Sequence, residues 1–386
     1  AKLCRAYAMF QLANVFCQAY APETASKDLG LPYPEIPEDR PGITYQRGTL
    51  AELYAHIEKD ITEGIPELGS RYVSPKFHFN VNAAHAFAAR FYLYYRKFDK
   101  AVEHATRVLG SSPASVLRDW SAWSKLGLSG NIQPNDFVKS SNKANLFLQV
   151  IATEWGGISI PISAGSKFAH GNLISDKETL QAPSPWAASG QEMNYVVVNN
   201  SGISKYALHK LPYTPKYIDR QAGIGIPYSQ YPVFTTDETL LVRAEALALL
   251  GRYDEALADL NAELSVFTKR GVQITLDQIK TFYNGTAYYK PDAPTPKKEL
   301  HTSITLDKVT QEPLLQCILQ LRRVLTIHEG LRMQDVKRYG ITIYRRRISS
   351  TGVLEQVTDQ MQARDPRLAI QIPQDVISAG LTANPR

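Results

Sequence analysis

Residues 237–260, DETLLVRAEALALLGRYDEALADL, carry two amphipathic helical patterns separated by a glycine. Leucine and alanine recur at helical spacing until Gly251 breaks the pattern, and Tyr253 opens a second apolar run with the same spacing. The small side chains of Ala244 and Ala256 would let the two helices approach closely. The stretch therefore predicts a helical hairpin with a glycine turn.

A second copy of this pattern lies in residues 89–105, ARFYLYYRKFDKAVEHA. One constant offset superimposes the small, aromatic and acidic positions of the two copies: Ala89 on Ala244, Phe98 on Tyr253, Asp99 on Asp254, and Ala101 on Ala256. Pro113 then follows Phe98 at the place where a tetratricopeptide repeat carries its closing proline. We therefore predict tetratricopeptide-like helix pairs as the scaffold of the fold.

The composition is that of an ordinary folded protein. Of the 386 residues, 44% are hydrophobic and 21% charged, and no apolar run approaches the roughly 18 residues of a membrane span. The chain opens on AKLCRAYAMF, a helical pattern with no basic-then-apolar leader, so we expect it to begin inside a larger protein. Cys4, Cys17 and Cys317 lack CxxC spacing, which argues against a disulfide framework or a zinc site. We expect Cys4 and Cys17 to be buried thiols.

Basic residues concentrate between Arg322 and Arg347, where Glu329 and Asp335 are the only acidic residues, and the net charge of the chain is +6. This cluster could be a nucleic-acid patch, or a set of arginines that pair with carboxylates elsewhere in the fold or face water. Because no nucleic-acid-binding motif accompanies the cluster, we favour the second interpretation and predict no nucleic-acid partner.

Further patterns place the other elements. Thr49 followed by Glu52 predicts a capping box at the start of a helix, which a proline-rich loop separates from a helix over residues 1–18. A single long helix is predicted from Pro313 to about Tyr339. Short strands are predicted within residues 145–155, 194–200 and 370–373.

These elements indicate a mainly α fold, in which tetratricopeptide-like helix-turn-helix repeats support an irregular, loop-rich lobe. The lobe is rich in Ser, Gly, Asn and Pro, yet it holds too many Val, Ile and aromatic residues to be disordered. We expect one domain over residues 1–386, with the helical scaffold in 1–113, 237–266 and 313–340, the lobe in 114–232 and 271–312, and a C-terminal tail in 341–386.

Segments spread over nearly the whole chain resemble, in order, the SusD/RagB family: RAYAMFQLANVF, a proline-rich loop with LPY, ELYAHIEKDI, AARFYLYYRKFDKAVEHA, LLVRAEALALLGRYDEALADLN, RRVLTIHEGLRMQDVKRYG and AIQIPQDVISAGLTANP. The most specific parts are EGLRMQDVKRYG and the IPQDVI...NP tail. The resemblance implies a SusD-like α/α superhelix, consistent with the helix pairs read from the sequence.

The resemblance also implies a cell-surface lipoprotein, anchored on the outward face of the bacterial outer membrane. Such proteins capture nutrients, usually glycans, and pass them to a TonB-dependent, SusC/RagA-like barrel on which they sit. The lipid anchor, its signal and its lipidated cysteine are not visible in this sequence, so anchoring rests on the resemblance alone. Cys4 has no preceding leader and cannot stand in for the lipidated residue.

No catalytic, metal-binding or cofactor-binding motif emerges from the sequence. His328-Glu329 opens like a zinc-protease motif but lacks the second histidine, and the SxxK pattern at Ser140–Lys143 lies in a polar run. The eight histidines are scattered, and the loop from Asn131 to Asp136 is too loose to assign calcium. We therefore predict a protein that is not an enzyme and has no cofactor and no assigned metal site; whether a metal orders the loops stays open.

Aromatic residues outside the repeats are the candidates for ligand binding. Sugar rings stack their C–H faces on Trp and Tyr, while Asn, Asp and Arg reach the hydroxyl groups. Taken singly, each such residue is more often part of a core, but we expect at least two to line a binding surface, with Trp155 and Trp186 the most exposed. The candidates are Trp120, Trp123, Trp155, Trp186, Asn284, Tyr288 and Tyr289.

Three functions remain open. The favoured one is capture of oligosaccharides for a TonB-dependent transporter. Capture of oligopeptides for the same kind of transporter is the alternative, because the RagB side of the family is associated with peptides and the NPR ending is closer to that side. A tetratricopeptide scaffold that binds protein tails in its groove is the third.

Overall fold

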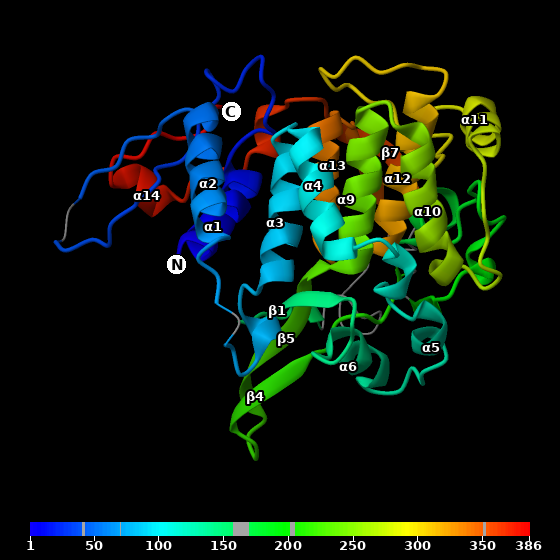
Figure 1. The fold of residues 1–386 in the computed structure, drawn as a ribbon, viewed down its shortest axis with the longest axis horizontal. Coiled ribbons are helices and arrows are strands. Elements are labelled where there is room, and N and C mark those ends of the chain that lie inside the picture. The colour runs from blue at the N-terminus through cyan, green and yellow to red at the C-terminus, as the bar shows by residue number, and fades with distance from the viewer. Residues whose placement is uncertain (41–42, 70, 157–169, 201–204, 350–352) are drawn as a thin grey trace.

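A row of antiparallel helices forms the scaffold of the computed structural model, which describes residues 1–40, 43–69, 71–156, 170–200, 205–349 and 353–386 (Figure 1). Helices pack in consecutive pairs, α1 on α2, α3 on α4 and α9 on α10, and α4 packs on α9 to join the last two pairs, while α12 also packs on α9. The row consists of α1 (Lys2–Phe16), α2 (Leu50–Gly64), α3 (Val81–Tyr94), α4 (Phe98–Leu109), α9 (Thr236–Leu249), α10 (Tyr253–Phe267) and α12 (Gln311–Leu325). The predicted mainly helical fold is confirmed.

The two repeats match in their turns as well as in their helices. Phe98 and Tyr253 are the first residues of α4 and α10, as the offset between the copies requires. Gly251 has a left-handed φ of 76° in the turn before α10, and Arg96, at the equivalent position before α4, has a φ of 61°. A residue with a Cβ adopts this conformation at a cost of about 1–2 kcal/mol, so the second repeat carries the unstrained version of the same turn.

The capping box at the start of α2 is also confirmed. The Thr49 hydroxyl accepts a hydrogen bond from the Glu52 backbone N–H at 3.2 Å, and the Glu52 carboxylate accepts one from the Thr49 N–H at 2.7 Å. These bonds satisfy two backbone donors that helix geometry leaves unpaired, which fixes where α2 begins.

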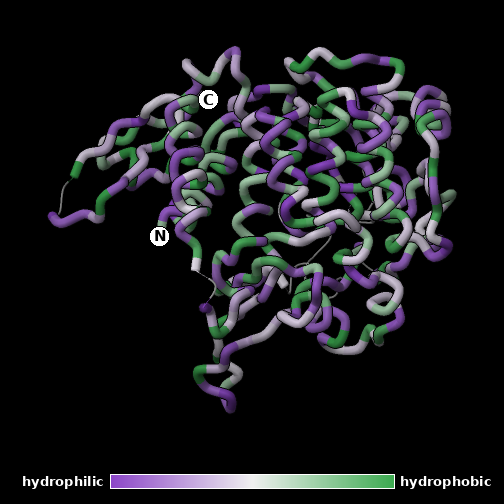
Figure 2. Tube along the Cα trace, viewed as in Figure 1, coloured by the Kyte–Doolittle hydropathy of each residue, from purple (hydrophilic) through white to green (hydrophobic). Residues whose placement is uncertain are grey.

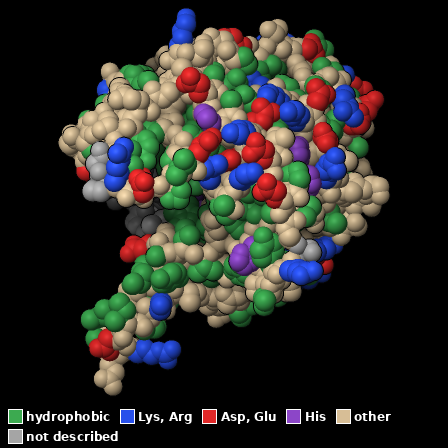
Figure 3. All heavy atoms as spheres, turned by 60° about the vertical axis from the view of Figure 1, so that its left-hand side comes forward, with side chains coloured by type: hydrophobic (Ala, Val, Ile, Leu, Met, Phe, Trp, Pro, Cys, Tyr) green, Lys and Arg blue, Asp and Glu red, His purple; other side chains and the backbone are tan. Residues whose placement is uncertain are grey.

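One antiparallel sheet, in the order β1-β5-β4, lies below the lower ends of α3 and α9 in the view of Figure 1. It contains β1 (Asn145–Ala152), which was predicted, and β4 (Thr214–Asp219) and β5 (Ile224–Thr235), which were not. Beyond the sheet, β4 and β5 continue as an arm that stands out from the body with hydrophobic side chains along it (Figure 3). In Figure 2 the turn at the tip of this arm is hydrophilic.

Short elements fill the lobe and the tail. The lobe contains α5 (Trp120–Ser124), α6 (Ile132–Val138), α8 (Asn172–Glu178), β2 (Val198–Asn200), β3 (Lys205–Ala207), α11 (Leu276–Gly285), and a 3-10 turn, η4 (Gly190–Glu192). The tail contains β6 (Ile343–Ile348), β7 (Leu354–Met361), η5 (Pro366–Leu368) and α14 (Gln374–Ser378). Two further 3-10 turns flank α3 and α4, η1 (Pro75–Phe77) and η2 (Pro113–Ser115).

Three sequence predictions about local structure are wrong. The long helix is broken into α12 and α13 (Arg332–Tyr339), because His328 and Gly330 adopt left-handed φ values of 69° and 76° between them. Residues 370–373 form no strand; the Ile370 N–H instead donates to the Val15 carbonyl, which ties the tail to the end of α1. Cys4 is exposed, whereas Cys17 is buried as expected.

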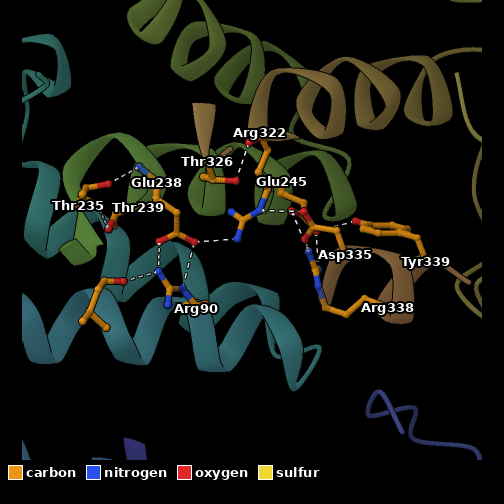
Figure 4. Close-up of polar contacts among 11 residues, drawn as sticks. Arg90, Thr235, Glu238, Thr239, Glu245, Arg322, Thr326, Asp335, Arg338 and Tyr339 are labelled. Atoms are coloured by element: carbon orange, nitrogen blue, oxygen red, sulfur yellow. Dashed lines mark hydrogen bonds and ion pairs between the residues drawn. The ribbon is translucent and has the colours of Figure 1, made fainter. Parts of the chain in front are cut away.

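A buried chain of alternating charges crosses the scaffold from α3 to α13 (Figure 4). Its members, in order, are Arg90, Glu238, Arg322, Asp335, Arg338 and Glu245. Glu238 accepts hydrogen bonds from Arg90 at 3.1 Å and from Arg322 at 2.8 Å. Burial alone would raise the pKa of Glu238, but the two guanidinium charges hold it below its ordinary value.

This chain explains the basic cluster of the sequence. Arg322 and Arg338 are paired with carboxylates on other helices, and Arg323 pairs with Glu178 of α8 at 2.8 Å. The prediction that these arginines pair within the fold is therefore confirmed for Arg322, Arg323 and Arg338. Since an unpaired buried charge is strongly destabilising, the same contacts specify how α3, α9, α12 and α13 pack.

None of the helices that the structure describes combines the length and the hydrophobicity needed to span a bilayer.

Candidate functional site

Three of the four tryptophans are buried in the lobe, which removes them from the candidate binding surface. Trp120 and Trp123 are each 1% exposed and Trp186 is 5% exposed. The Trp120 indole N–H donates to Asp237 at 2.9 Å, and that of Trp123 donates to the Gln133 carbonyl at 3.0 Å. With their ring faces and their N–H groups both used inside the protein, these side chains form the core of the lobe.

The expected exposure of Trp186 is wrong, and its turn explains why. The Ala187 N–H donates to the Ser184 hydroxyl at 3.0 Å, and the Ser184 N–H donates to the Ala187 carbonyl at 2.9 Å. This closed turn directs Trp186 inward. Pro183 and Pro185, which precede Trp186, indicated a loop correctly but not the direction of its side chain.

Trp155 is the tryptophan that reaches the surface. It lies three residues beyond the end of β1 and is 42% exposed. Its indole N–H donates to the His328 carbonyl at 2.8 Å, and its backbone N–H donates to the Thr153 hydroxyl at 3.1 Å. The ring is therefore held in place while much of its surface remains accessible, as an aromatic stacking platform requires.

The turn that anchors Trp155 is itself fixed. The His328 Nε2 atom accepts a hydrogen bond from the Leu208 N–H at 3.3 Å. Burial lowers the pKa of His328 well below its ordinary value, so the ring stays neutral and keeps the acceptor that this bond needs. The neighbouring Glu329 carboxylate forms an ion pair with the buried Lys210. The His328-Glu329 pair is thus part of the support beneath Trp155.

A second exposed aromatic residue, Tyr213, lies beside this platform and was not predicted. Gly156 packs so closely on the Pro212 carbonyl that an added Cβ would collide with it, which places the segments 155–156 and 212–213 in direct contact. Tyr213 is 38% exposed, and its carbonyl accepts a hydrogen bond from the Asn131 amide at 3.1 Å. We call Trp155, Tyr213 and Asn131 the Trp155 platform. Residues 157–169, which follow directly, lie outside the described residues.

The other candidates lie elsewhere. Tyr288 is 36% exposed and donates to Glu312 at 2.5 Å, and the ammonium group of Lys297 lies 4.2 Å from the centre of its ring. Tyr289 is half-buried, with Lys298 over its ring at 3.4 Å, and Asn284 is exposed at the end of α11. A lysine covers one face of each tyrosine ring, so that face is already occupied by a cation.

The candidates around Tyr288 and the Trp155 platform lie near opposite ends of α12, so the two groups are far apart. Tyr288 bonds to Glu312 in the first turn of α12, whereas Trp155 bonds to the carbonyl of His328, three residues after its end. With a rise of 1.5 Å per residue, these points are about 20 Å apart. One sugar ring cannot contact both groups, so we treat the Trp155 platform as the principal candidate site.

The lysine of the SxxK pattern and a pair of neighbouring histidines have partners within the fold. Lys143 of the SxxK pattern donates to the Ser115 carbonyl at 2.7 Å. His85 and His104 approach to 2.8 Å between their Nδ1 atoms, and burial followed by the neighbouring His85 lowers the pKa of His104 to about 4. Within the described ranges, no group of three His, Cys, Asp or Glu side chains could hold a metal ion.

Comparisons with known proteins identify the fold. A SusD-like family, described as starch-binding and associating with the outer membrane, matches residues 1–93. A SusD superfamily protein from Bacteroides thetaiotaomicron VPI-5482 is 20% identical, with a TM-score of 0.63 over 100% of this chain and 77% of that one. No curated protein matches the sequence.

Two solved structures from Bacteroides vulgatus ATCC 8482 are also similar. A putative sugar binding protein is 19% identical, with a TM-score of 0.61 over 100% of this chain and 76% of that one. A SusD-like carbohydrate binding protein is 14% identical, with a TM-score of 0.57 over 94% of this chain and 67% of that one. The chain is thus similar to a SusD-like family over residues 1–93, and over its whole length it shares the fold of SusD superfamily structures.

Proposed function

We propose that this chain captures oligosaccharides at the bacterial surface through the Trp155 platform. The observation that carries the proposal is an exposed indole fixed by hydrogen bonds at both its ring and its backbone. The fold supports it, because proteins described as carbohydrate-binding or sugar-binding share that fold. The described chain offers no comparable exposed tryptophan elsewhere.

The platform has the chemistry that a sugar needs. The apolar face of a pyranose would stack on the Trp155 ring, and the Tyr213 side chain would offer a second aromatic surface on the contacting segment. Because the Trp155 N–H is already bonded to the His328 carbonyl, the indole contributes stacking and not a new hydrogen bond. Affinity would therefore depend on the ring being present and held, with hydroxyl contacts supplied by its neighbours.

The proposal extends to the cellular setting. The matching family is described as associating with the outer membrane, and we propose an outward-facing, lipid-anchored protein that passes its cargo to a TonB-dependent, SusC/RagA-like barrel. Oligopeptide cargo and protein-tail binding in the helical groove are the competing outcomes. Co-purification of a tagged chain with a barrel from its native outer membrane would test the partner separately from the cargo.

Native mass spectrometry against one oligosaccharide mixture and one peptide mixture tests the cargo. We expect sugar adducts on the unmodified chain and a loss of about tenfold in affinity for Trp155→Ala, the effect of removing about 1.4 kcal/mol of stacking. Tyr217→Ala on the β4–β5 arm is the matched control, because Tyr217 is also exposed, at 48%, but lies on the arm. Peptide adducts alone would replace the glycan proposal with peptide capture, and equal losses in both variants would reject the platform.

A further inference from the structure

A second pocket lies between α1 and the face of the sheet. It has a volume of about 490 Å³ and is separate from the Trp155 platform. Cys4, Tyr7 and Gln11 line it from α1, where their spacing of three and four residues places them on one helical face. This volume is within the range of about 300–1,000 Å³ typical of small-molecule sites.

The opposite wall is built by strand register. Phe147 and Gln149 alternate on one face of β1, and Gln149 lies directly across from Tyr231 of β5. Phe79, which precedes α3, closes the pocket. Tyr7 meets Phe79 and Phe147 edge to face, at 5.9 Å and 6.2 Å between ring centres, so one side of the pocket is an aromatic wall.

The polar groups of the pocket form a chain of neutral donors and acceptors. The Tyr231 hydroxyl donates to the side-chain amide oxygen (Oε1) of Gln149 at 2.9 Å, and the hydroxyls of Tyr7 and Tyr231 also contact each other. Among the residues that the structure describes, the side-chain amide nitrogen (Nε2) of Gln149 has no hydrogen-bond partner. Gln149 is only half-buried, so its two N–H donors can reach a bound molecule.

Among the described residues, those that line this pocket include no charged side chain. A charged ligand would lose its hydration without gaining a counter-charge, which is costly. A neutral sugar ring instead matches the chemistry: its C–H face can pack on the aromatic wall and its hydroxyls can bond to the glutamine amides and the Tyr231 hydroxyl.

We propose that this pocket is a second binding site, selective for a neutral sugar unit over an acidic one. The inference rests on the proposed function only for the chemical class of the ligand, since its residues are distinct from those of the Trp155 platform. Gln149 and Trp155 are six residues apart in the sequence, so their Cα atoms are at most roughly 20 Å apart. A single oligosaccharide chain could therefore occupy both.

Cys4 provides a direct probe of occupancy. It is exposed on the rim of the pocket, whereas Cys17 and Cys317 are buried at 1% and 0% exposure. Burial also raises the pKa of Cys17 to about 11, which suppresses its reactive thiolate. An alkylating reagent should therefore modify Cys4 selectively, at a rate that falls when the pocket is filled.

The experiment measures the rate of iodoacetamide labelling of Cys4 with and without neutral hexoses, and with glucuronate as the charged comparison. At ten times the dissociation constant we expect labelling to slow roughly tenfold with a neutral hexose and to change little with glucuronate. The protection should persist in Trp155→Ala and disappear in Gln149→Leu, while Tyr231→Phe weakens it. Unchanged melting temperatures in these variants would show that the pocket, and not the fold, was altered.

Three results would overturn the proposal. Labelling that no hexose slows, up to its solubility limit, would mean that the pocket does not bind sugar. Equal protection by glucuronate would contradict selection by charge. Protection that vanishes in Trp155→Ala but survives in Gln149→Leu would assign all sugar binding to the Trp155 platform, so the proposed function would stand while the second site would fall.

Discussion

Two buried glutamates of one helical hairpin should respond in opposite ways to the same substitution. Glu238 on α9 is 1% exposed and Glu263 on α10 is 0% exposed. Glu238 is ionised between two arginines, whereas neither carboxylate oxygen of Glu263 has a hydrogen-bond partner among the described residues. Glutamine has nearly the same shape as glutamate. Replacing Glu238 by glutamine therefore removes the negative charge that pairs with two arginines, whereas replacing Glu263 removes a buried carboxylic acid without a hydrogen-bond partner among the described residues.

The loss of stability expected for Glu238→Gln follows from the two arginine charges that the substitution leaves unpaired with Glu238. Arg90 and Arg322 would lose their shared buried counter-charge, a change that typically costs about 3–5 kcal/mol. Unfolding entropy of about 2.1 cal/mol/K per residue gives roughly 0.8 kcal/mol/K for 386 residues. The melting temperature should therefore fall by about 4–6 °C.

Glu263→Gln should raise the melting temperature instead of lowering it, and it should do so only above mildly acidic pH. Burial, followed by the charge of Asp237, raises the pKa of Glu263 well above its ordinary 4.5. Above that pH the unfolded chain releases this proton while the folded chain retains it, so stability falls by about 1.4 kcal/mol per pH unit until the folded pKa is reached. Glutamine does not titrate, and the variant should escape this loss.

Thermal unfolding of both variants at acidic and at neutral pH provides the assay. Glu255→Gln is the control, since Glu255 pairs with Arg252 at the surface, at 2.7 Å, and surface pairs contribute little. We expect Glu238→Gln to be less stable near neutral pH, and Glu263→Gln to match the parent near pH 4.5 and exceed it at neutral pH. Equal destabilisation by both glutamines at neutral pH would refute the reasoning, because it would mean that Glu263 is ionised and paired.

Gly340→Ala should lower the melting temperature more than Gly251→Ala. Both glycines have left-handed φ values, but a methyl group at 340 would lie 2.7 Å from the His301 carbonyl oxygen, whereas one at 251 meets nothing within 4 Å; equal shifts would contradict this. The ion pairs of Glu178 should be lost in acid: Arg323 and Lys298 overcome its burial and lower its pKa to about 2, below the unfolded value of 4.5, so its contribution is complete above pH 4.5 and disappears as pH falls toward 2. Glu178→Gln should flatten the pH dependence of unfolding over that window, and an unchanged slope would count against the pairing. Mass spectrometry after brief alkylation of the folded chain should find Cys4 modified and Cys17 and Cys317 protected until unfolding, and early loss of either buried thiol would contradict its burial.

Local signals were enough to predict the helical scaffold. The offset between Phe98 and Tyr253 depends on residues a few positions apart, and the capping box of Thr49 and Glu52 is contained within four residues. Such patterns fix helix boundaries without reference to distant parts of the chain. The mainly helical fold could therefore be predicted before any packing was known.

Two features of the fold, strand β5 and the break between α12 and α13, were not predicted. Strand β5 contains Gly225, Pro227 and Pro232, which read as breakers, and it forms a strand by pairing with β1, about eighty residues earlier. The break between α12 and α13 lies at His328 and Gly330; the glycine can end a helix, but the left-handed conformation of His328 has no strong sequence signal. In both cases tertiary contacts outweigh local preference.

The candidate site was predictable only in part. Trp155 was expected to be exposed and is, but Trp186 carries the same kind of loop signal and is buried by its closed turn. Tyr213 was missed because its position depends on how Pro212 packs against Gly156. The spacing of the residues that line the second pocket from α1 is that of an ordinary buried helix face, so the cavity could not be predicted from this pattern.

The burial of three tryptophans makes fluorescence quenching the most direct test of glycan capture by the Trp155 platform. With Trp120, Trp123 and Trp186 at most 5% exposed and Trp155 at 42%, acrylamide should quench mainly Trp155. We predict that a bound oligosaccharide lowers the quenchable fraction of the emission in proportion to its occupancy, and that Trp155→Ala abolishes this change. An oligosaccharide that binds, as judged by native mass spectrometry, but leaves the quenching of Trp155 unchanged would contradict the proposal.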